Sequence, residues 1–285
     1  MEIHDIFVVG AGFMGSGIAQ TAIQKGYHVT LNDQRSDALE RAKAGIRARL
    51  DRLVAKERMT AEEVEACMGR LTISTSLEGA AHAGLAIEAI YEDLEAKKAV
   101  FRQLDQICDP STILASNTSS ISITAIAAAT QRPDKFIGMH FFNPATVMKL
   151  VEVIRGAHTS DETYNTIAEL AKAIGKEPVE VNEAPGFVVN KILIPMINEA
   201  CDLVYTGVAS VEGVDTAMKL GANHPMGPLA LGDLVGLDVC LAIMDTLYNE
   251  THDPKYRASL LMRKMVRASK LGRKTGIGFY DYSKK

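Results

Sequence analysis

The segment FIGMHFFNPATVMKLVEVI, residues 136–154, contains one imidazole and one carboxylate among mostly apolar side chains. His140 lies at the end of one apolar run, Glu152 lies inside the next, and an Asn-Pro pair separates the two runs. An imidazole exchanges protons near neutral pH, and a carboxylate bound to its second ring nitrogen fixes the tautomer and stabilises the imidazolium. The pair therefore predicts general acid-base catalysis. The alternative is a histidine that is satisfied within the core and has no chemical role.

A second group of residues has the spacing of a dinucleotide-binding turn. Gly10, Gly12 and Gly15 form GxGxxG directly after an apolar run, and Asp33 ends the next run. In such turns the glycines permit a tight bend, close approach of a pyrophosphate, and close packing of helix on strand. A carboxylate at the position of Asp33 accepts hydrogen bonds from the adenosine ribose and repels a 2′-phosphate, which favours NAD over NADP. Arg35 leaves the alternative open, because its guanidinium is either a surface charge or a partner for that phosphate.

Basic residues recur in the predicted helix at residues 36–59. Arg49, Arg52 and Lys56 are three and four residues apart, so a continuous helix would place them on one face. That face could hold a phosphate-bearing substrate. The alternative is an ordinary solvated face, because acidic residues are interleaved with the basic ones.

Three polar residues lie at positions of the predicted fold that could contact a ligand. Ser119 and Ser120 follow a predicted strand, at the carboxyl end where open α/β sheets bind ligands. Their alternative role is to cap the next helix, and we expect one of the two to do so. Asn190 lies early in a helix after the predicted domain break, where a polar group faces either a cleft between domains or water.

The elements that position these residues alternate regularly. Longer segments of helical spacing separate most of the short, β-branched runs, and these runs are almost continuously apolar, as in parallel strands covered on both faces. We therefore predict an α/β fold with a doubly wound, mostly parallel sheet. The predicted strands lie at residues 6–10, 28–33, 71–74, 85–90, 112–117, 135–142 and 149–154.

The pattern changes near residues 178–187. Beyond the sequence Glu183-Ala184-Pro185-Gly186, segments 188–207, 211–221 and 229–250 have helical spacing and no strand pattern. We predict a nucleotide-binding domain at residues 1–184 and an all-helical domain at residues 185–285.

Composition narrows the classes of partner. The 285 residues are 47% hydrophobic and 23% charged, with a formal net charge of −4, so nucleic acid and anionic membranes are not expected as main partners. Four cysteines stand far apart without a CxxC pair, and we predict no metal site. The chain begins without a signal segment and has no run of about 20 apolar residues. We expect a cytoplasmic protein.

The chain contains six further motifs in this order: GAGFMGSGIAQ, ASNTSS, GMHFFNPATVMKLVEV, EAPGFVVNKILIPMINEA, GANHPMGPLALGDLVGLD and GRKTGIGFYDY. With these motifs it resembles the 3-hydroxyacyl-CoA dehydrogenase family, and especially its bacterial members that act on 3-hydroxybutyryl-CoA, from about residue 3 to residue 282. The resemblance implies a Rossmann domain followed by a helical domain that contributes to substrate binding and pairs subunits into a homodimer or a larger homo-oligomer.

The same resemblance implies a role for each matching residue. His140 is the catalytic base, Glu152 is its acidic partner, and Ser119 and Asn190 hydrogen-bond the substrate. The coenzyme A contacts fall on Arg49 and Lys56. The implied contacts of the nicotinamide cofactor are Gly10, Gly12, Phe13, Met14, Gly15, Asp33, Glu92, Lys97, Ser119, Asn143 and Lys274.

The expected activity is therefore NAD-dependent interconversion of a short-chain (S)-3-hydroxyacyl-CoA and its 3-oxoacyl-CoA, with His140 as general acid and base. One alternative is a two-domain dehydrogenase of a free hydroxy acid or sugar acid, which needs no basic helix for coenzyme A. Another is an NAD-binding protein without catalysis, which would tolerate loss of His140 or Glu152. A third is a fragment of a multifunctional fatty-acid oxidation protein, although a chain that begins just before its first strand and ends after GFYDY favours a complete protein.

Overall fold

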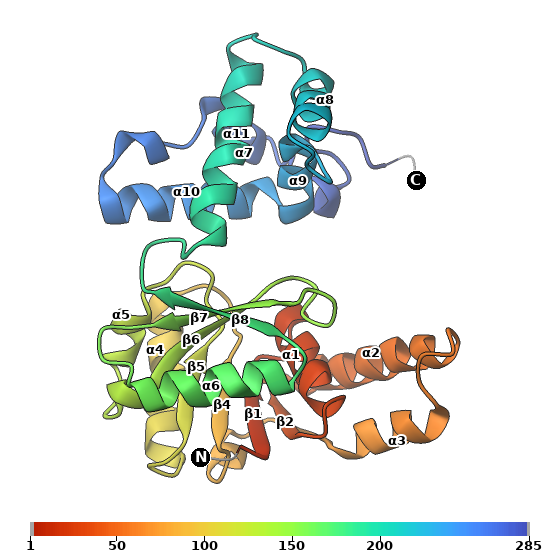
Figure 1. The fold of residues 1–285 in the computed structure, drawn as a ribbon, viewed down its shortest axis with the longest axis vertical. Helices are drawn as coiled ribbons and strands as arrows, with labels where there is room; N and C mark the ends of the chain where they lie inside the picture. The colour runs from red at the N-terminus through yellow and green to blue at the C-terminus, as the bar shows by residue number, and fades with distance from the viewer. Residues whose placement is uncertain (1–2, 284–285) are drawn as a thin grey trace. The chain divides into compact units, whose positions relative to one another are not determined.

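A computed structural model describes residues 3–283, and the chain divides between Ala184 and Pro185 into two compact units. The first unit contains one eight-stranded sheet with the order β3-β2-β1-β4-β5-β6-β7-β8 (Figure 1). Strands β1 to β6 run parallel, β7 is antiparallel to β6, and β8 is parallel to β7. This arrangement confirms the predicted doubly wound, mostly parallel sheet. The strands are β1 (Asp5–Val9), β2 (His28–Asn32), β3 (Leu71–Ser74), β4 (Leu85–Glu88), β5 (Ile113–Ser116), β6 (Phe136–Phe141), β7 (Leu150–Arg155) and β8 (Glu177–Asn182).

Strand β8 was not predicted from the sequence. It lies at the edge of the sheet, and Val181 is its only buried residue. Pro178 lies within the strand, which an edge tolerates because one side of the strand needs no hydrogen-bond donors. The sequence of β8, EPVEVN, therefore lacks the run of apolar and β-branched residues that revealed the other seven strands.

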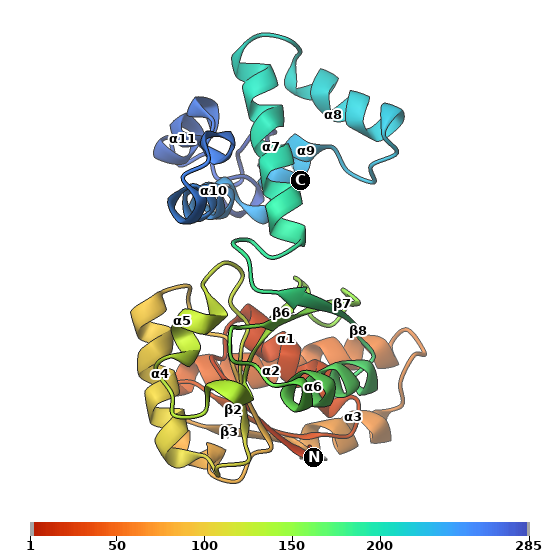
Figure 2. The ribbon, with the colours of Figure 1, turned by 60° about the vertical axis from the view of Figure 1, so that its left-hand side comes forward.

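Helices cover both faces of this sheet. Figure 2 shows α4 and α5 together on one side of the sheet and α6 on the other. The helices of the first unit are α1 (Phe13–Ile23), α2 (Ser36–Val54), α3 (Ala61–Gly69), α4 (Leu94–Ile107), α5 (Ile123–Ala127) and α6 (Asp161–Ala173), with short 3-10 turns η1 (Leu77–Ala80) and η2 (Pro133–Lys135).

Alternation along the strands divides the core between the two faces. Ile6 and Val8 of β1 belong to the core that α1, α2 and α6 complete. Phe7, between them, points to the opposite face because successive side chains of a strand alternate. On that opposite face Phe136 of β6 packs edge-on against Phe101 of α4, with 4.6 Å between ring centroids. Both faces of the sheet are therefore buried, which is why its strands are nearly all apolar.

The second unit is helical, as predicted, and Figure 1 shows its helices grouped around α7. Its core contains apolar side chains from α7, α8, α9, α10 and α11. Within residues 3–283, no helix combines the length and the apolar character needed to cross a bilayer. The helices are α7 (Val189–Tyr205), α8 (Val211–Gly221), α9 (Pro228–Val235), α10 (Leu237–Thr251) and α11 (Leu260–Arg267), with 3-10 turns η3 (Pro254–Tyr256) and η4 (Arg273–Thr275).

The helical spacing of residues 229–250 is divided between two helices. Gly236 separates α9 from α10. Its φ is 103°, a backbone angle that residues with a Cβ rarely adopt. The sequence pattern continues across this break because both helices bury apolar side chains in the same core.

Asp233 of α9 attaches the segment 278–282 to the helical unit. Its carboxylate accepts hydrogen bonds from the backbone nitrogens of Phe279 and Tyr280, each at 3.0 Å, and from the hydroxyl of Tyr282 at 3.1 Å. A Cβ on Gly278 would lie 2.0 Å from the carboxylate, so only glycine fits at this point. Burial raises the pKa of Asp233 although the three hydrogen bonds oppose that shift.

Candidate active site

The glycine-rich turn between β1 and α1 has the shape that a dinucleotide requires. Gly10 has a φ of 101°, and its backbone nitrogen donates to the carbonyl oxygen of Asn32 at 2.7 Å. A Cβ on Gly15 would lie 1.8 Å from the Gly10 carbonyl oxygen, so helix and turn pack too closely for any side chain. A Cβ on Gly12 would meet nothing within 4 Å, which leaves open space at the start of α1. The residues present therefore fit a pyrophosphate bound at the helix N-terminus.

Asp33, directly after β2, is joined to this turn. One carboxylate oxygen accepts a hydrogen bond from the backbone nitrogen of Ala11 at 3.0 Å, and the other accepts one from the backbone nitrogen of Arg35 at 3.0 Å. Each carboxylate oxygen can accept a further hydrogen bond, so the arrangement fits a ribose as well. In dinucleotide-binding folds a carboxylate at this position repels a 2′-phosphate.

His140 and Glu152 form a hydrogen-bonded pair across β6 and β7. The His140 Nδ1 atom lies 2.7 Å from the Glu152 Oε2 atom, and the two side chains are 8% and 1% exposed. The ring of Phe142 packs against the imidazole with 4.5 Å between centroids. Because the carboxylate binds Nδ1, Nε2 is the ring atom that can exchange a proton with a substrate.

Strand register brings further polar groups to the same face of the sheet. Glu88 of β4 is aligned with Ser116 of β5, which is aligned with Gly138 of β6. His140 is two residues beyond Gly138 and therefore shares its face. Glu152 lies directly opposite His140 in the antiparallel pair. The carboxyl ends of β4, β5 and β6 thus carry a row of polar side chains within an apolar sheet.

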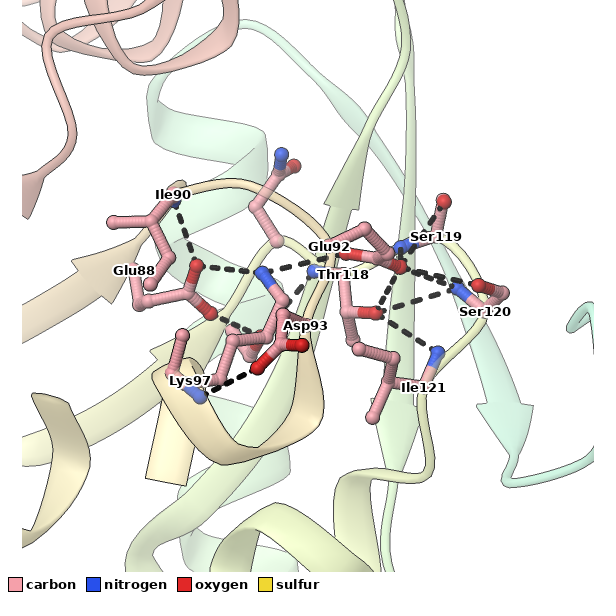
Figure 3. Close-up of polar contacts among 12 residues, drawn as sticks. Glu88, Ile90, Glu92, Asp93, Lys97, Thr118, Ser119, Ser120 and Ile121 are labelled. Carbon is pink, nitrogen blue, oxygen red and sulfur yellow. Dashed lines mark hydrogen bonds and ion pairs between the residues drawn. The ribbon is translucent and has the colours of Figure 1, made fainter. Parts of the chain in front are cut away.

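Beyond these strands, Glu92 binds the segment at residues 118–120, as Figure 3 shows. Its Oε1 atom accepts hydrogen bonds from the hydroxyl of Thr118 at 2.5 Å and from the backbone nitrogens of Ser119 and Ser120 at 2.9 and 3.1 Å. The hydroxyls of the two serines lie 3.2 Å from the same atom. Burial raises the pKa of Glu92, but nearby Lys97 and these hydrogen bonds outweigh burial, so its pKa lies below the usual value. At neutral pH the carboxylate is ionised.

Lys97 connects Glu92 to the buried Glu88 (Figure 3). Its Nζ atom lies 2.6 Å from the Glu88 Oε1 atom and 3.3 Å from the Glu92 Oε2 atom. Glu88 also accepts hydrogen bonds from the backbone nitrogen of Ile90 and from the hydroxyl of Ser116, both at 2.7 Å. The lysine is 1% exposed, Glu88 is 0% exposed and Glu92 is 36% exposed, so Glu92 is the member of this group that solvent reaches. The expected contact between Lys97 and a cofactor stays a prediction.

The expectation that Ser119 or Ser120 caps a helix is wrong. Helix α5 begins at Ile123, and its cap is Ser122, whose hydroxyl oxygen accepts a hydrogen bond from the backbone nitrogen of Ala125 at 3.0 Å. The segment 118–120 instead donates its hydrogen bonds to Glu92, because several charge-assisted hydrogen bonds to one carboxylate are stronger together than a single helix cap.

The predicted basic face is shorter than the sequence suggested. Helix α2 ends at Val54, so Lys56 lies in the following turn, and only Arg49 and Arg52 share the helix. The Nε atom of Arg49 donates to the side chain of Gln20 at 2.6 Å, whereas its buried Nη2 atom has no hydrogen-bond partner within residues 3–283. Burial lowers the pKa of Arg49, with a smaller contribution from Arg52. An anion beside Arg49 would give that orphaned donor a partner.

The structure shows the local surroundings of three other predicted site residues. Asn143 is exposed after β6 and is joined to Pro144 by a cis peptide bond. Asn190 is buried at the start of α7, in the second unit. In the same unit, Lys274 lies 2.6 Å from the Oδ2 atom of Asp238.

Sequence reasoning did not identify Glu88, Ser116 or Thr118. A usable signal was present, because Glu88 is a lone carboxylate inside the apolar run at residues 85–90. Glu152 is also a lone carboxylate inside an apolar run, and the nearby histidine is what identified it as a candidate. Ser116 and Thr118 gave none, since small hydroxyl side chains are common at the ends of buried strands.

Comparison with known proteins places the chain in a family. The NAD binding domain of 3-hydroxyacyl-CoA dehydrogenase matches residues 5–184, and the C-terminal domain of 3-hydroxyacyl-CoA dehydrogenase matches residues 186–282. A probable 3-hydroxybutyryl-CoA dehydrogenase of Bacillus subtilis is 54% identical over 100% of this chain and 99% of its own length. A 3-hydroxybutyryl-CoA dehydrogenase of Clostridioides difficile is 55% identical over 97% of this chain and 99% of its own.

A solved structure agrees with these matches. The crystal structure of an (S)-3-hydroxybutyryl-CoA dehydrogenase from Ralstonia eutropha is 50% identical to this chain and covers 99% of it, and all of that structure is covered, with a TM-score of 0.97. The glycine-rich turn, Asp33 and the His140–Glu152 pair lie within the matched NAD binding domain. The chain belongs to the 3-hydroxyacyl-CoA dehydrogenase family.

Proposed function

We propose that this protein interconverts (S)-3-hydroxybutyryl-CoA and acetoacetyl-CoA, with NAD as the partner in hydride transfer. The hydrogen bond between His140 and Glu152 carries the proposal, because it supplies an oriented base at the carboxyl end of a nucleotide-binding sheet. The relatives that act on 3-hydroxybutyryl-CoA support the choice of substrate. The alternative, a dehydrogenase of a free hydroxy acid or sugar acid, does not account for the family match.

The proton transfer follows from the histidine pair. When bound, NAD accepts a hydride from the third carbon of the acyl chain as the alcohol becomes a ketone. In that step Nε2 of His140 takes the proton of the hydroxyl, and Glu152 at Nδ1 stabilises the imidazolium. In the reverse direction the imidazolium returns the proton to the oxygen of the ketone. No metal is needed for either step.

Two polar residues are proposed to orient the substrate. Ser119, held beside Glu92, hydrogen-bonds the reacting oxygen, and Asn190 hydrogen-bonds an oxygen of the thioester or of the reacting group. Asn143 and Lys274 are proposed to contact the cofactor together with the glycine-rich turn. Each of these roles depends on the family resemblance and on the polar character of the residue.

For coenzyme A we propose a contact with Arg49 and Lys56. Both residues are cationic, and the orphaned Nη2 atom of Arg49 can donate to a phosphate oxygen. The phosphate groups of an acyl-CoA lie far along the molecule from the reacting carbon. This contact therefore contributes to binding rather than to hydride transfer.

The helical unit is proposed to pair subunits. It exposes large apolar side chains at Ile192, Val208, Leu220 and Leu260, each more than 60% exposed. Covering such side chains would remove apolar surface from water, and a second copy of the chain is the partner proposed. The free thiols of all four cysteines fit the reducing cytoplasm, which we propose as the location.

The decisive experiment offers two substrates to the purified protein. Acetoacetyl-CoA with NADH should cause a loss of NADH absorbance, whereas free acetoacetate with NADH should not. His140→Gln should abolish most of the loss, and His158→Gln, at an exposed histidine of the same unit, should not change it. If NADH is oxidised with free acetoacetate but not with acetoacetyl-CoA, the proposed substrate is wrong and the protein acts on a free keto acid.

A further inference from the structure

The charges of Glu88, Lys97 and Glu92 do not cancel. Two carboxylates share one ammonium group, and the ammonium nitrogen lies closer to Glu88, at 2.6 Å, than to Glu92, at 3.3 Å. The ammonium charge of Lys97 therefore neutralises more of the charge on Glu88 than of the charge on Glu92, because the electrostatic interaction weakens with distance. One unit of negative charge is left, and most of it resides on Glu92.

Glu88 is the residue that creates this excess. Without it, Lys97 and Glu92 would form a neutral pair that still holds the segment 118–120. Burying a second carboxylate is costly, and here the cost is offset by the ammonium group and by donors from Ile90 and Ser116. Holding a loop does not require this arrangement. What Glu88 adds to the pair of Lys97 and Glu92 is a net negative charge, which lies mostly on Glu92.

The place of this charge in the sheet suggests what it acts on. The strand order reverses between β1 and β4, and dinucleotides bind across such a reversal. Asp33 lies on the β2 side, where it receives the adenosine ribose, so the nicotinamide half belongs on the β4 side. Glu92 follows β4, and the segment it binds follows β5. His140, at the end of β6, lies on the same side of the reversal.

We propose that Glu88, acting through Lys97 and Glu92, shifts the cofactor preference of the site toward the oxidised form. The nicotinamide ring of NAD⁺ carries a positive charge and that of NADH is neutral, so a fixed negative charge stabilises the first selectively. Glu88 is a positioning residue in this scheme, since it acts through its neighbours. The proposal rests on the proposed function only in taking NAD as the cofactor.

The test measures cofactor binding without substrate. Dissociation constants for NAD⁺ and for NADH are determined separately for the wild type, Glu88→Gln and Glu92→Gln. Both variants should raise the ratio of the NAD⁺ constant to the NADH constant, on the order of tenfold for loss of one partly screened charge. Glutamine keeps the size and most hydrogen bonds of the side chain, so the charge is the main change.

Glu95→Gln is the matched control. Glu95 lies on α4 near Lys97, but its side chain is 70% exposed and pairs with Lys98 at 3.0 Å. Solvent screens its charge, so this variant should leave the ratio unchanged. If Glu88→Gln does not fold, as judged by circular dichroism, Glu92→Gln carries the test because its side chain is partly exposed.

Equal weakening of both cofactors, or an unchanged ratio in a folded Glu88→Gln variant or in Glu92→Gln, would overturn the proposal. An equal shift in the control variant would also overturn it. Turnover of acetoacetyl-CoA is measured separately in the wild type. A protein that binds both cofactors with the expected ratios but does not reduce acetoacetyl-CoA would refute the proposed function and leave this inference standing.

Discussion

His140 and Glu152 are direct cross-strand neighbours in the antiparallel pair of β6 and β7, with 2.7 Å between Nδ1 and Oε2. The acid is therefore set against the histidine by strand register and not by a flexible loop. A shift of one residue in register would turn one of the two side chains to the opposite face of the sheet. The buried apolar residues that flank both positions prevent such a shift.

Replacement of His140 by Gln should lower turnover by about 10²- to 10⁴-fold, the range typical of a positioned acid-base group. The dissociation constant of NADH should remain the same, because the cofactor is expected to bind the glycine-rich turn and Asp33. Steady-state kinetics and NADH titration give the two values. Full activity in this variant would assign the proton transfer to another group.

Replacement of Glu152 by Gln should lower turnover by about 10- to 10⁴-fold, because the imidazolium formed during oxidation loses its carboxylate. The measurement is turnover in the direction of alcohol oxidation, with the thermal midpoint as a check on folding. Glu180→Gln is the control, since Glu180 lies on the neighbouring strand β8 and is 47% exposed. If both variants retain full turnover, Glu152 is a structural acid only.

Replacement of Asp33 by Ala should weaken NADH binding by about 1.5 to 3 kcal/mol, the value of a charge-assisted hydrogen bond. The same change should improve NADPH binding, because the repulsion of its 2′-phosphate is removed. Titration with each cofactor measures both effects. A wild-type preference for NADPH would contradict the assignment and direct attention to Arg35.

Replacement of Lys56 by Ala should raise the Michaelis constant for acetoacetyl-CoA and leave turnover nearly unchanged, because a distant phosphate contact stabilises ground state and transition state alike. The effect should diminish as salt rises. Lys43→Ala, an exposed lysine on α2, is the control. An unchanged Michaelis constant at low salt would mean that Lys56 belongs to a solvated surface.

Replacement of Glu92 by Gln should destabilise the first unit more at about pH 7 than at about pH 3. The pKa of Glu92 is lower in the folded protein than its usual value of 4.5, so ionisation favours folding. That contribution is complete above the pKa of the unfolded chain and is lost as pH falls through the folded value. Thermal midpoints of wild type and variant across this range measure it. A constant difference would contradict the pKa shift.

The sequence was most informative where burial is continuous. Most of the strands β1 to β7 were found because both faces of the sheet are covered, which makes nearly all of their residues apolar. Strand β8 was missed because Pro178 and the charged Glu180 interrupt its apolar residues, whereas β3, the other edge strand, has neither proline nor charge. The fold class was therefore predictable, whereas the last strand depended on its tertiary neighbours.

For the site, local spacing predicted the glycine-rich turn and brought attention to His140 and Glu152. It did not reveal that Glu88 and Glu92 share Lys97, because these partners come from a strand, a loop and a helix. It also misplaced the helix cap, since Ser119 and Ser122 are equally good caps by residue type and only the position of Glu92 separates them.

The hydrogen bonds between Asp233 and the segment 278–282 have a consequence for the synthesis of the protein. Asp233 is synthesised long before Phe279, Tyr280 and Tyr282, so its buried carboxylate has no partner from this segment while the nascent chain emerges from the ribosome. Helix α9 can complete its packing only after residue 282 has left the exit tunnel. A nascent chain that ends before this point leaves the carboxylate of Asp233 without these three donors, and the helical unit is less stable by the cost of burying an unpaired acid.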